Sequence, residues 1–253
     1  MYATILVWVA LIVGSAVYTL RTSGEALTSR KTVVNFFAIV VEMLPPDLSA
    51  VQTLGKPMVE TVAMSVMATL VAALAAIPAG FLASRTTTPH PLVAHLVRGV
   101  LGALRTIPEL ILAIIFVASV GFGILPGILA LAAHSTGMLG KLFAEEIEKA
   151  DPGLTEAVAS CGGSKFHVII FGVVPQIVTH LVDFTLFRWE HNFRASAVVG
   201  MVGAGGIGFA LVSSLRLLQY RQVSAILLVV FVVVLLVEGF GNLVRSRLLG
   251  RSN

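Results

Sequence analysis

Six apolar runs, separated by short polar connections, constrain the fold of this chain more than any other feature. A helix needs roughly 20 mostly apolar residues to cross the hydrocarbon core of a bilayer. Hydrophobic residues make up 57% of the 253 positions and charged residues only 12%, which excludes an ordinary soluble domain. We therefore predict an all-α, polytopic membrane protein with about six transmembrane helices, one for each run: 3–20, 60–84, 99–120, 124–142, 166–187 and 222–244.

Residues 1–58 differ from the rest of the chain, because they hold one apolar run followed by a long connection of mixed polarity. The first run has no basic residue before Leu20 and no small-residue cleavage site followed by a soluble domain, which favours a membrane helix over a cleaved signal peptide. Val33–Met43 is expected to lie in the membrane interface before Pro45 and Pro46 end it. We predict an amino-terminal helix and connection over 1–58 and one core transmembrane domain over 59–253.

The distribution of basic residues does not settle the orientation in the membrane. Basic loops stay cytoplasmic, but with Arg105 set aside as intramembrane, lysines and arginines divide eight against eight when the 151–164 segment is placed inside. The expected inner set is Arg85, Arg98, Lys141, Lys149, Lys165, Arg245, Arg247 and Arg251, and the outer set is Arg21, Arg30, Lys31, Lys56, Arg188, Arg194, Arg216 and Arg221. An outward arginine face would concentrate an anionic substrate, although solvated or headgroup-facing loops explain the same charges.

The sequence shows no sign of catalysis by this chain. Cys161 is the only cysteine, so an internal disulfide and a cysteine-rich metal cluster are excluded. A G-x-x-x-x-G-K-[ST] phosphate loop is absent from the sequence. Gly203, Gly205 and Gly208 match G-x-G-x-x-G, but no soluble strand precedes them and no acidic residue follows about 20 positions on. We expect no catalytic, metal or cofactor site, and no nucleic-acid partner.

Charged and polar residues inside the apolar runs mark candidate sites. Arg105 and Glu109 stand four apart across Pro108, a spacing that places them on one helix face as an intramembrane charge pair. Such a pair is costly and is either a functional site or a structural pair near a helix end. His134, beside Ser135, Thr136 and Gly137, is expected to hydrogen-bond between closely packed helices rather than to contact a ligand.

The stretch RWEHNFRASAVVGMVGAGGIGF, residues 188–209, holds the densest set of unusual residues. Its glycines predict a broken helix, and irregular backbone at membrane depth survives only where protein buries it or it lines a wet cavity. We therefore expect it to face the transport path or a subunit interface. The candidate path residues are Arg188, Glu190, Arg194, Gly203, Gly205, Gly206 and Gly208.

A polar insert, DPGLTEAVASCGGSKFHVIIFGVVPQI (151–177), lies between apolar segments. Pro152 can start a short helix, Glu156 suits the positive end of its dipole, and Gly162–Gly163 would end it. An ordinary amphipathic loop is the simplest alternative. The order and spacing of Glu156, Ala157, Ala159, Gly162 and Pro175–Gln176 resemble the signature of membrane subunits of ATP-binding-cassette (ABC) importers. The sequence departs from that signature at Val158, Gly172 and Val174, where alanine, isoleucine and leucine are usual.

The resemblance narrows to the phosphonate-transport branch of these permeases and covers the chain from about residue 55 onward. It rests on RTIPELILAIIF (105–116), HSTGMLGKLFAEEIE (134–148), RWEHNFRAS (188–196) and VGAGGIGF (202–209). It implies a type I importer fold like that of methionine permeases, in the bacterial inner membrane. It also implies the ATPase-coupling residues Glu156, Ala157, Ala159, Gly162, Gly163 and Pro175 in a coupling helix near 151–164.

The implied partners are a second copy of the chain, two copies of a cytoplasmic ABC ATPase that binds ATP and Mg²⁺, an extracytoplasmic phosphonate-binding protein and membrane lipid. The substrate would be a phosphonate or a related phosphorus oxyanion. A methionine-type importer is the nearest alternative, because it shares the signature and a similar glycine-rich segment. An ion-coupled secondary transporter, which would work without ATP, and a structural subunit of a membrane enzyme complex are alternatives from other classes.

Overall fold

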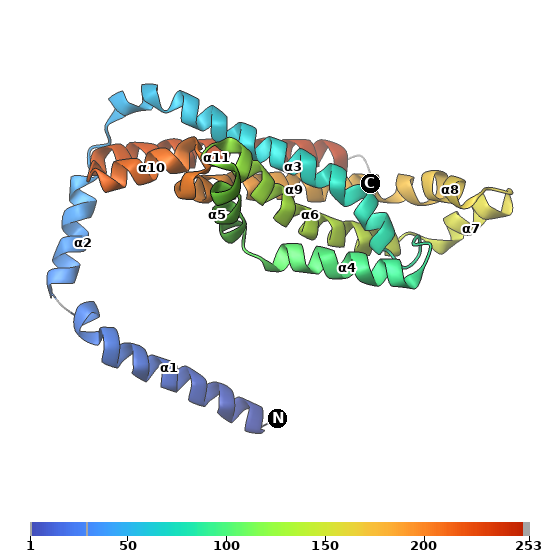
Figure 1. Cartoon of the computed structure of the whole chain (residues 1–253), viewed down its shortest axis with the longest axis horizontal. Coiled ribbons are helices and arrows are strands. Elements are labelled where there is room, and N and C mark those ends of the chain that lie inside the picture. Colours follow the sequence, from blue (N-terminus) through green and yellow to red (C-terminus); the bar gives the residue numbers. More distant parts are fainter. Residues whose placement is uncertain (1, 29, 250–253) are drawn as a thin grey trace.

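The computed structural model describes residues 2–28 and 30–249, and every regular element in this part of the chain is helical. Most of the helices form one elongated bundle, and α2 and α1 extend away from one end of it (Figure 1). Their bounds are α1 Tyr2–Thr28, α2 Arg30–Glu42, η1 Leu48–Thr53, α3 Gly55–Ala83, α4 Pro91–Thr106, α5 Glu109–Val120, α6 Ile124–Glu148, α7 Pro152–Ser160, α8 Lys165–His167, η2 Val168–Val173, α9 Val174–Val199, η3 Gly200–Ala204, α10 Gly206–Arg216 and α11 Tyr220–Leu249.

Among the described residues, four helical segments are long and apolar enough to cross a membrane: Gly55–Ala83, Ile124–Glu148, Lys165–Ala204 and Tyr220–Arg247. Helices α4 and α5 together would make a fifth crossing. The first predicted run lies in α1, whose apolar stretch, Val7–Thr22, is shorter. The all-helical membrane fold is confirmed, and the predicted count of about six is reached only if α1 also crosses. The predicted start of the core, residue 59, falls within the first turns of α3.

The third apolar run does not form one helix. Helix α4 ends at Thr106, α5 begins at Glu109, and the two are bent by 87° at the break. Pro108 explains the break, because a proline disfavours helical backbone at the residue before it and lacks a backbone N–H. Ile107 is accordingly extended, with ψ of 120°.

Small residues allow the central helices α3 and α6 to approach each other closely. Ala68, Ala72 and Ala76 of α3 are completely buried. At Gly80 a Cβ atom would lie 2.8 Å from Phe143 Cβ, so the two backbones meet there. Close approach through small residues is the usual way in which membrane helices pack, because lipid supplies little hydrophobic drive. These contacts hold α3 and α6 as the centre of the bundle.

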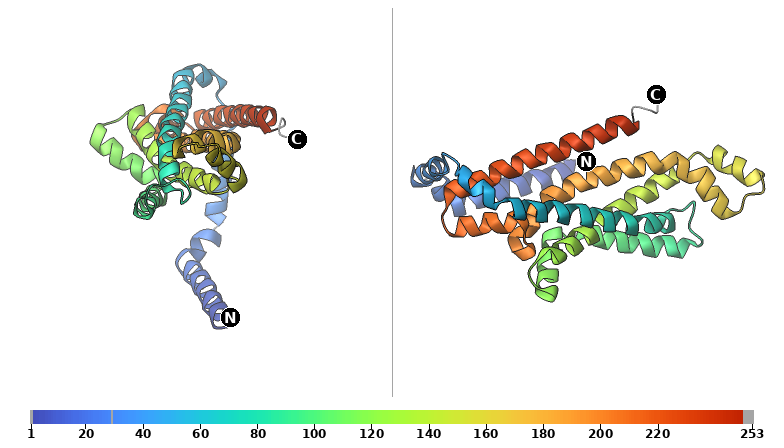
Figure 2. Two further views of the ribbon diagram at one scale, coloured as in Figure 1. Left: turned by 90° about the vertical axis from the view of Figure 1, so that its right-hand side faces the viewer. Right: turned by 90° about the horizontal axis from the view of Figure 1, so that it is seen from above.

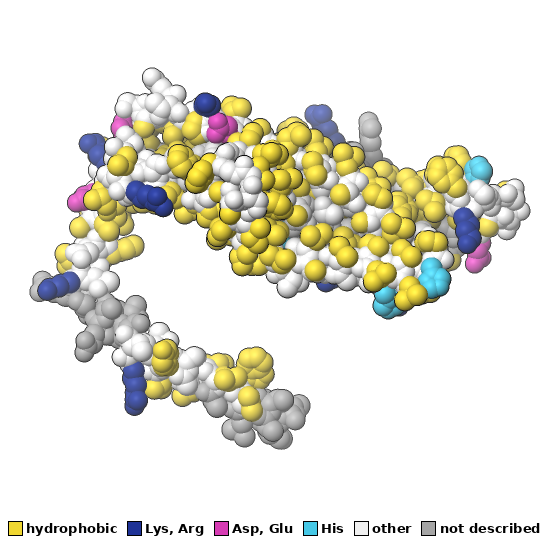
Figure 3. Space-filling view, viewed as in Figure 1, with side chains coloured by type: hydrophobic (Ala, Val, Ile, Leu, Met, Phe, Trp, Pro, Cys, Tyr) yellow, Lys and Arg dark blue, Asp and Glu magenta, His cyan; other side chains and the backbone are white. Residues whose placement is uncertain are grey.

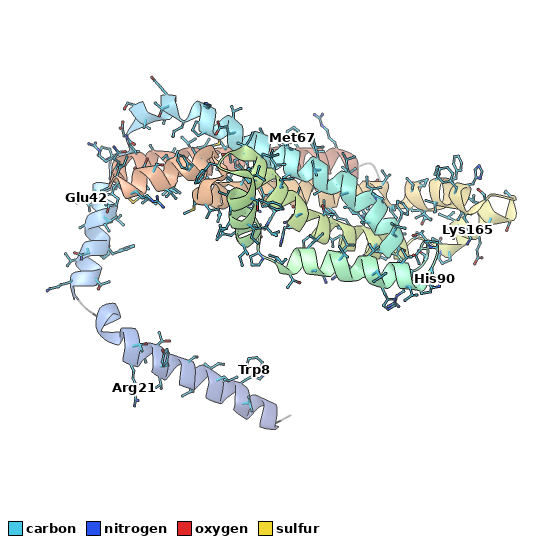
Figure 4. The ribbon with its side chains drawn as sticks, in the orientation of Figure 1. Trp8, Arg21, Glu42, Met67, His90 and Lys165 are labelled. Carbon is cyan, nitrogen blue, oxygen red and sulfur yellow. The ribbon has the colours of Figure 1, made fainter. Side chains whose placement is uncertain are left out.

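The surface divides into an apolar middle and two polar ends. Apolar side chains cover the middle of the bundle on the face seen in Figure 3, and charged side chains and histidines gather toward its ends. Glu42 marks one end, whereas His90 and Lys165 mark the other, which carries α7 and α8 (Figure 4). We call the latter the α7 end. This distribution is that expected of a membrane-spanning bundle.

The segment Lys165–Ala204 is helical over 40 residues. At 1.5 Å per residue it is about 60 Å long, roughly twice the hydrocarbon thickness of a bilayer. Its first part, α8 and η2, projects with α7 beyond the other helices (Figures 1 and 2). The continuous segment therefore connects the α7 end to the middle of the bundle.

Candidate functional site

A chain of buried polar side chains crosses the middle of the bundle between α9, α6 and α3. Arg188 Nε donates to Ser135 Oγ at 2.9 Å, and Ser135 Oγ donates to Asn192 Oδ1 at 2.9 Å. Asn192 Nδ2 then donates to Thr69 Oγ1, also at 2.9 Å. Asn192 and Ser135 are completely buried. We call Arg188, Ser135, Asn192 and Thr69 the polar relay.

Arg188 is the one member of the relay that carries a charge, and one of its hydrogen-bond donors has no partner in the described part of the chain. Its side chain is buried, with 5% of the residue exposed. Its Nη2 atom is buried without a hydrogen-bond partner among the described residues. An unpaired buried donor costs about 1–3 kcal/mol, and more when charged. A residue kept at such a cost inside a membrane is a functional-site candidate.

Glu109 lies in the same part of the bundle, at the start of α5. Its carboxylate oxygens are 3.7 Å from His134 Nε2 and 3.8 Å from His191 Nε2. The charge of Arg188 also attracts it. Across the described residues, no group of three or more His, Cys, Asp and Glu side chains is arranged to hold a metal ion. The cluster thus pairs a carboxylate with nitrogen-bearing side chains of α6 and α9.

The predicted pairing of Arg105 with Glu109 is wrong. The i, i+4 argument requires one continuous helix, and the chain bends by 87° between the two residues. Arg105 instead lines a cavity of about 130 Å³ with Lys141 and Glu145. The predicted interhelical contact of His134 is confirmed, because its Nδ1 lies 3.0 Å from the carbonyl oxygen of Ile107 at the break.

Arg188 and Arg194, which were expected on the outer side, both lie within α9, and Arg188 is buried there rather than in a solvated loop. Glu190 and Arg194 contact α11 rather than each other. Arg194 Nη1 is 2.5 Å from Glu238 Oε1, and Arg245 Nη2 is 3.0 Å from Glu190 Oε1. Arg245 also bonds Asp183 at 2.8 Å. These charges tie α9 to α11. Among the three charged path residues, only Arg188 keeps a buried donor, Nη2, without a hydrogen-bond partner in the described part of the chain.

The glycine-rich stretch breaks the helix, as predicted. Gly203, Gly205 and Gly206 have φ of 108°, 79° and 67°, which L side chains rarely adopt. Side chains of α3 cap the start of α10: Glu60 Oε2 accepts from Gly206 N, and Thr61 Oγ1 accepts from Ile207 N at 2.8 Å. At Gly208 a Cβ atom would lie 1.9 Å from the carbonyl oxygen of Ala197. This bend is buried in protein; its place on a transport path stays a prediction.

The insert forms the predicted short helix, α7. Asp151 caps it by accepting from Gly153 N at 2.8 Å, and Pro152 occupies its first turn. The chain turns after Ser160, and Gly162 has φ of 82°. Glu156, Ala157 and Ala159 lie on this projecting helix, where none of the residues is buried, so they are accessible to another protein. Gly163 and Pro175 flank the next helix, beside the turn and at the start of α9, respectively.

Several residues of these sites were not found from the sequence. Asn192, Ser135 and Thr69 are single polar residues on three helices, and no local pattern marks them. Leu154 and Phe166 project from α7 and α8 with 53% and 68% exposure. Large apolar residues within a polar insert are the sequence signal that could have indicated this surface, because exposed apolar patches often mark protein contacts. Gln176 was quoted only as part of the signature, and its contacts are described below.

A helical bundle with a buried, charged centre and a projecting helix at one end defines the class of a polytopic transport subunit. The model of the family "Binding-protein-dependent transport system inner membrane component" matches residues 76–250. The chain belongs to this family and is a multi-pass permease subunit of the inner membrane.

Two relatives and one solved structure place the chain within the family. It is 46% identical over 222 residues to the phosphite transport system permease protein PtxC of Stutzerimonas stutzeri, covering 88% of this chain and 81% of that protein. It is 44% identical to the phosphate-import permease protein PhnE of Mycolicibacterium smegmatis, covering 87% of this chain and 42% of that protein. An inward-facing MetNI methionine ABC transporter chain superposes with a TM-score of 0.70 at 19% identity, covering 80% of this chain and 99% of that chain, which shows a shared fold.

Proposed function

We propose that this chain is the permease subunit of an ABC importer for phosphite, a phosphonate or another phosphorus oxyanion. The observation that carries the substrate class is the 46% identity with a phosphite permease across 88% of the chain. The likeness to the methionine transporter is one of fold and does not favour methionine as substrate. A secondary transporter is disfavoured, because members of this family depend on a binding protein.

The proposed complex contains two copies of this chain, two cytoplasmic ATPase subunits, an extracytoplasmic binding protein and surrounding lipid. ATP and Mg²⁺ would bind to the ATPase, and this chain would carry out no catalysis. Helix α7 would contact the ATPase through Glu156, Ala157 and Ala159, with the turn at Gly162 and Gly163 behind them. The exposed side chains of Leu154 and Phe166 support this role by adding apolar area to the same end.

The oxyanion would pass the level of Arg188. Guanidinium groups bind oxyanions through charge-assisted hydrogen bonds, and Nη2 of Arg188 has no partner among the described side chains. Arg194 and Glu190 are occupied by Glu238 and Arg245, so they support α9 rather than bind substrate. A weak, transient contact is sufficient for a permease whose selectivity comes from a binding protein.

The test is transport by the complete complex in lipid vesicles, with phosphite, methylphosphonate and phosphate as substrates and sulfate as the control anion. Stimulation of ATP hydrolysis by the loaded binding protein, lost in Glu156→Ala, would support the importer and the α7 contact. ATP-independent uptake would support the secondary transporter instead.

Arg188→Gln should lower uptake by about tenfold or more, which corresponds to about 1.4 kcal/mol, with the complex still assembled. Arg194→Gln is the matched control on the same helix and should lower uptake less. Equal losses in the two variants would contradict a direct role for Arg188.

A further inference from the structure

One side chain joins the start of α7 to the start of α9. Gln176 Oε1 accepts a hydrogen bond from Asp151 N at 2.8 Å, and its Nε2 donates to the carbonyl oxygen of Gly172 at 2.6 Å. Asp151 is the residue that caps α7, whereas Gly172 belongs to η2. Asp151 and Gln176 are 25 residues apart in the chain. Gln176 therefore connects the start of α7 to the start of α9, the two ends of the projecting segment that contains α7 and α8.

A close backbone contact lies beside this hydrogen-bonded bridge. Gly172 is buried, and a Cβ atom there would lie 3.2 Å from Thr155 Cα and 3.3 Å from Thr155 Cγ2. Helix α7 thus rests directly on η2. The isoleucine usual at this position of the importer signature would push the two elements apart, so the departure from the signature has a physical reason. We call Gln176, Gly172 and the facing Thr155 the α7 latch.

A cavity lies beside the latch, between α7, η2 and the carboxyl-terminal end of α6. Its volume is about 480 Å³, and its lining includes Thr86, Pro89, Glu148, Thr155 and Lys165. Helix α7 buries none of its residues. It therefore has room to move toward the bundle, while the latch fixes it to α9.

The element under the latch is itself irregular. Segment η2 is π-helical, and Pro175 follows it in the first turn of α9. π-Helical turns are rare and are often found at functional sites, and proline removes one helix hydrogen bond. Without the latch, the chain would bend most easily at this point, between α7 and the rest of α9.

We propose that Gln176 is a positioning residue that makes α7 and α9 move together, so that displacement of α7 by the ATPase reaches the level of Arg188. This inference rests on the proposed contact between α7 and the ATPase. Loss of the latch would let α7 follow the ATPase while η2 absorbs the movement. Hydrolysis would then continue with less transport for each ATP consumed.

The first test compares Gln176→Ala and Gln176→Glu with Gln52→Ala in the complete complex in vesicles. Gln52 is exposed on η1, at the opposite end of the bundle, and serves as the matched control. A net hydrogen bond is worth about 1 kcal/mol, which corresponds to about fivefold. We expect Gln176→Ala to lower substrate taken up per ATP by about this factor, with assembly and hydrolysis retained. An unchanged ratio, or a proportional loss of both activities, would overturn the proposal.

The second test needs no ATPase. Cys161, the only cysteine and an exposed one, lies at the end of α7, so a fluorophore attached to it reports the motion of that helix. In the full chain in lipid, Gln176→Ala should lower the fluorescence anisotropy, and Gln52→Ala should not. Unchanged anisotropy in Gln176→Ala would overturn the latch. A wild-type complex without ATP-driven uptake would contradict the proposed function, and the anisotropy measurement would still decide whether the latch exists.

Discussion

Helices α6 and α7 follow each other in the chain, yet they are held in opposite ways. Helix α6 has buried residues along most of its length, from Pro126 to Ile147, whereas α7 buries none. The centre of α6 is fixed by packing and by the polar relay, and α7 by a capping aspartate and one glutamine. The difference separates a part that keeps its shape from a part that can be displaced as a unit.

The largest expected effect comes from Gly208→Ala, in the buried bend. A Cβ atom there would lie 1.9 Å from a backbone oxygen, and overpacking costs about 1–3 kcal/mol or more. We expect the variant to lose thermal stability in detergent or to fail to fold. Gly99→Ala, where a Cβ atom meets nothing within 4 Å, is the control and should unfold like the wild type. Similar melting of Gly208→Ala would show that the bend is not fixed by close packing.

Asn192→Leu should have the next largest effect, because it removes two hydrogen bonds of the polar relay and leaves the Ser135 and Thr69 hydroxyls short of a partner. The expected loss is about 2 kcal/mol, measured by thermal unfolding in detergent. Asn35→Leu, at an exposed position of α2, should change stability by less than about 0.5 kcal/mol. Equal melting of the two variants would contradict the structural role of the relay.

Gly162→Ala tests α7, the helix that the comparison identifies as displaceable. The residue has φ of 82°, and a Cβ atom there would meet nothing within 4 Å, so only backbone strain of about 1–2 kcal/mol opposes alanine. We expect faster hydrogen exchange in α7 with little change in global melting. Gly162→Asn, which tolerates this conformation better, should fall between alanine and wild type. A drop in global melting would show that α7 unfolds together with the bundle.

The smallest expected effect lies at the end opposite α7, where Asp47 caps η1. Its hydrogen bond from the Ser49 side chain lowers the pKa of Asp47 below the ordinary 3.8. Because the folded-state pKa is lowered, the contribution of this cap is present above the unfolded pKa and is lost as pH falls through the folded pKa. The Ser49 amide resonance should titrate with a midpoint below 3.8. Asp47→Asn should abolish that titration, and a midpoint above 3.8 would contradict the cap.

The sequence predicted those features that depend on neighbouring residues. The apolar runs located α3, α6, α9 and α11, Pro152 and Gly162 bounded α7, and the glycines located the bend after α9. Each of these is decided by local backbone preference or by length.

Features that depend on distant parts of the chain were missed or misplaced. Glu109 was paired with Arg105 by helix spacing, but its partners come from α6 and α9. Arg188 was expected in a solvated outer region because the fifth apolar run ends before it, whereas α9 continues through it and buries its side chain. Charges within a bundle interrupt the hydropathy pattern without ending the helix, since Arg188 donates to Ser135 and Arg194 pairs with Glu238.

The break at Pro108 also selects the tautomer of His134 on α6, because it presents a backbone carbonyl oxygen to that side chain. His134 Nδ1 lies 3.0 Å from the Ile107 carbonyl oxygen, and a carbonyl oxygen can only accept, so Nδ1 carries the hydrogen. Nε2 is then the nitrogen that faces the Glu109 carboxylate, 3.7 Å away. A change in the bend between α4 and α5 would therefore free the imidazole to exchange tautomers.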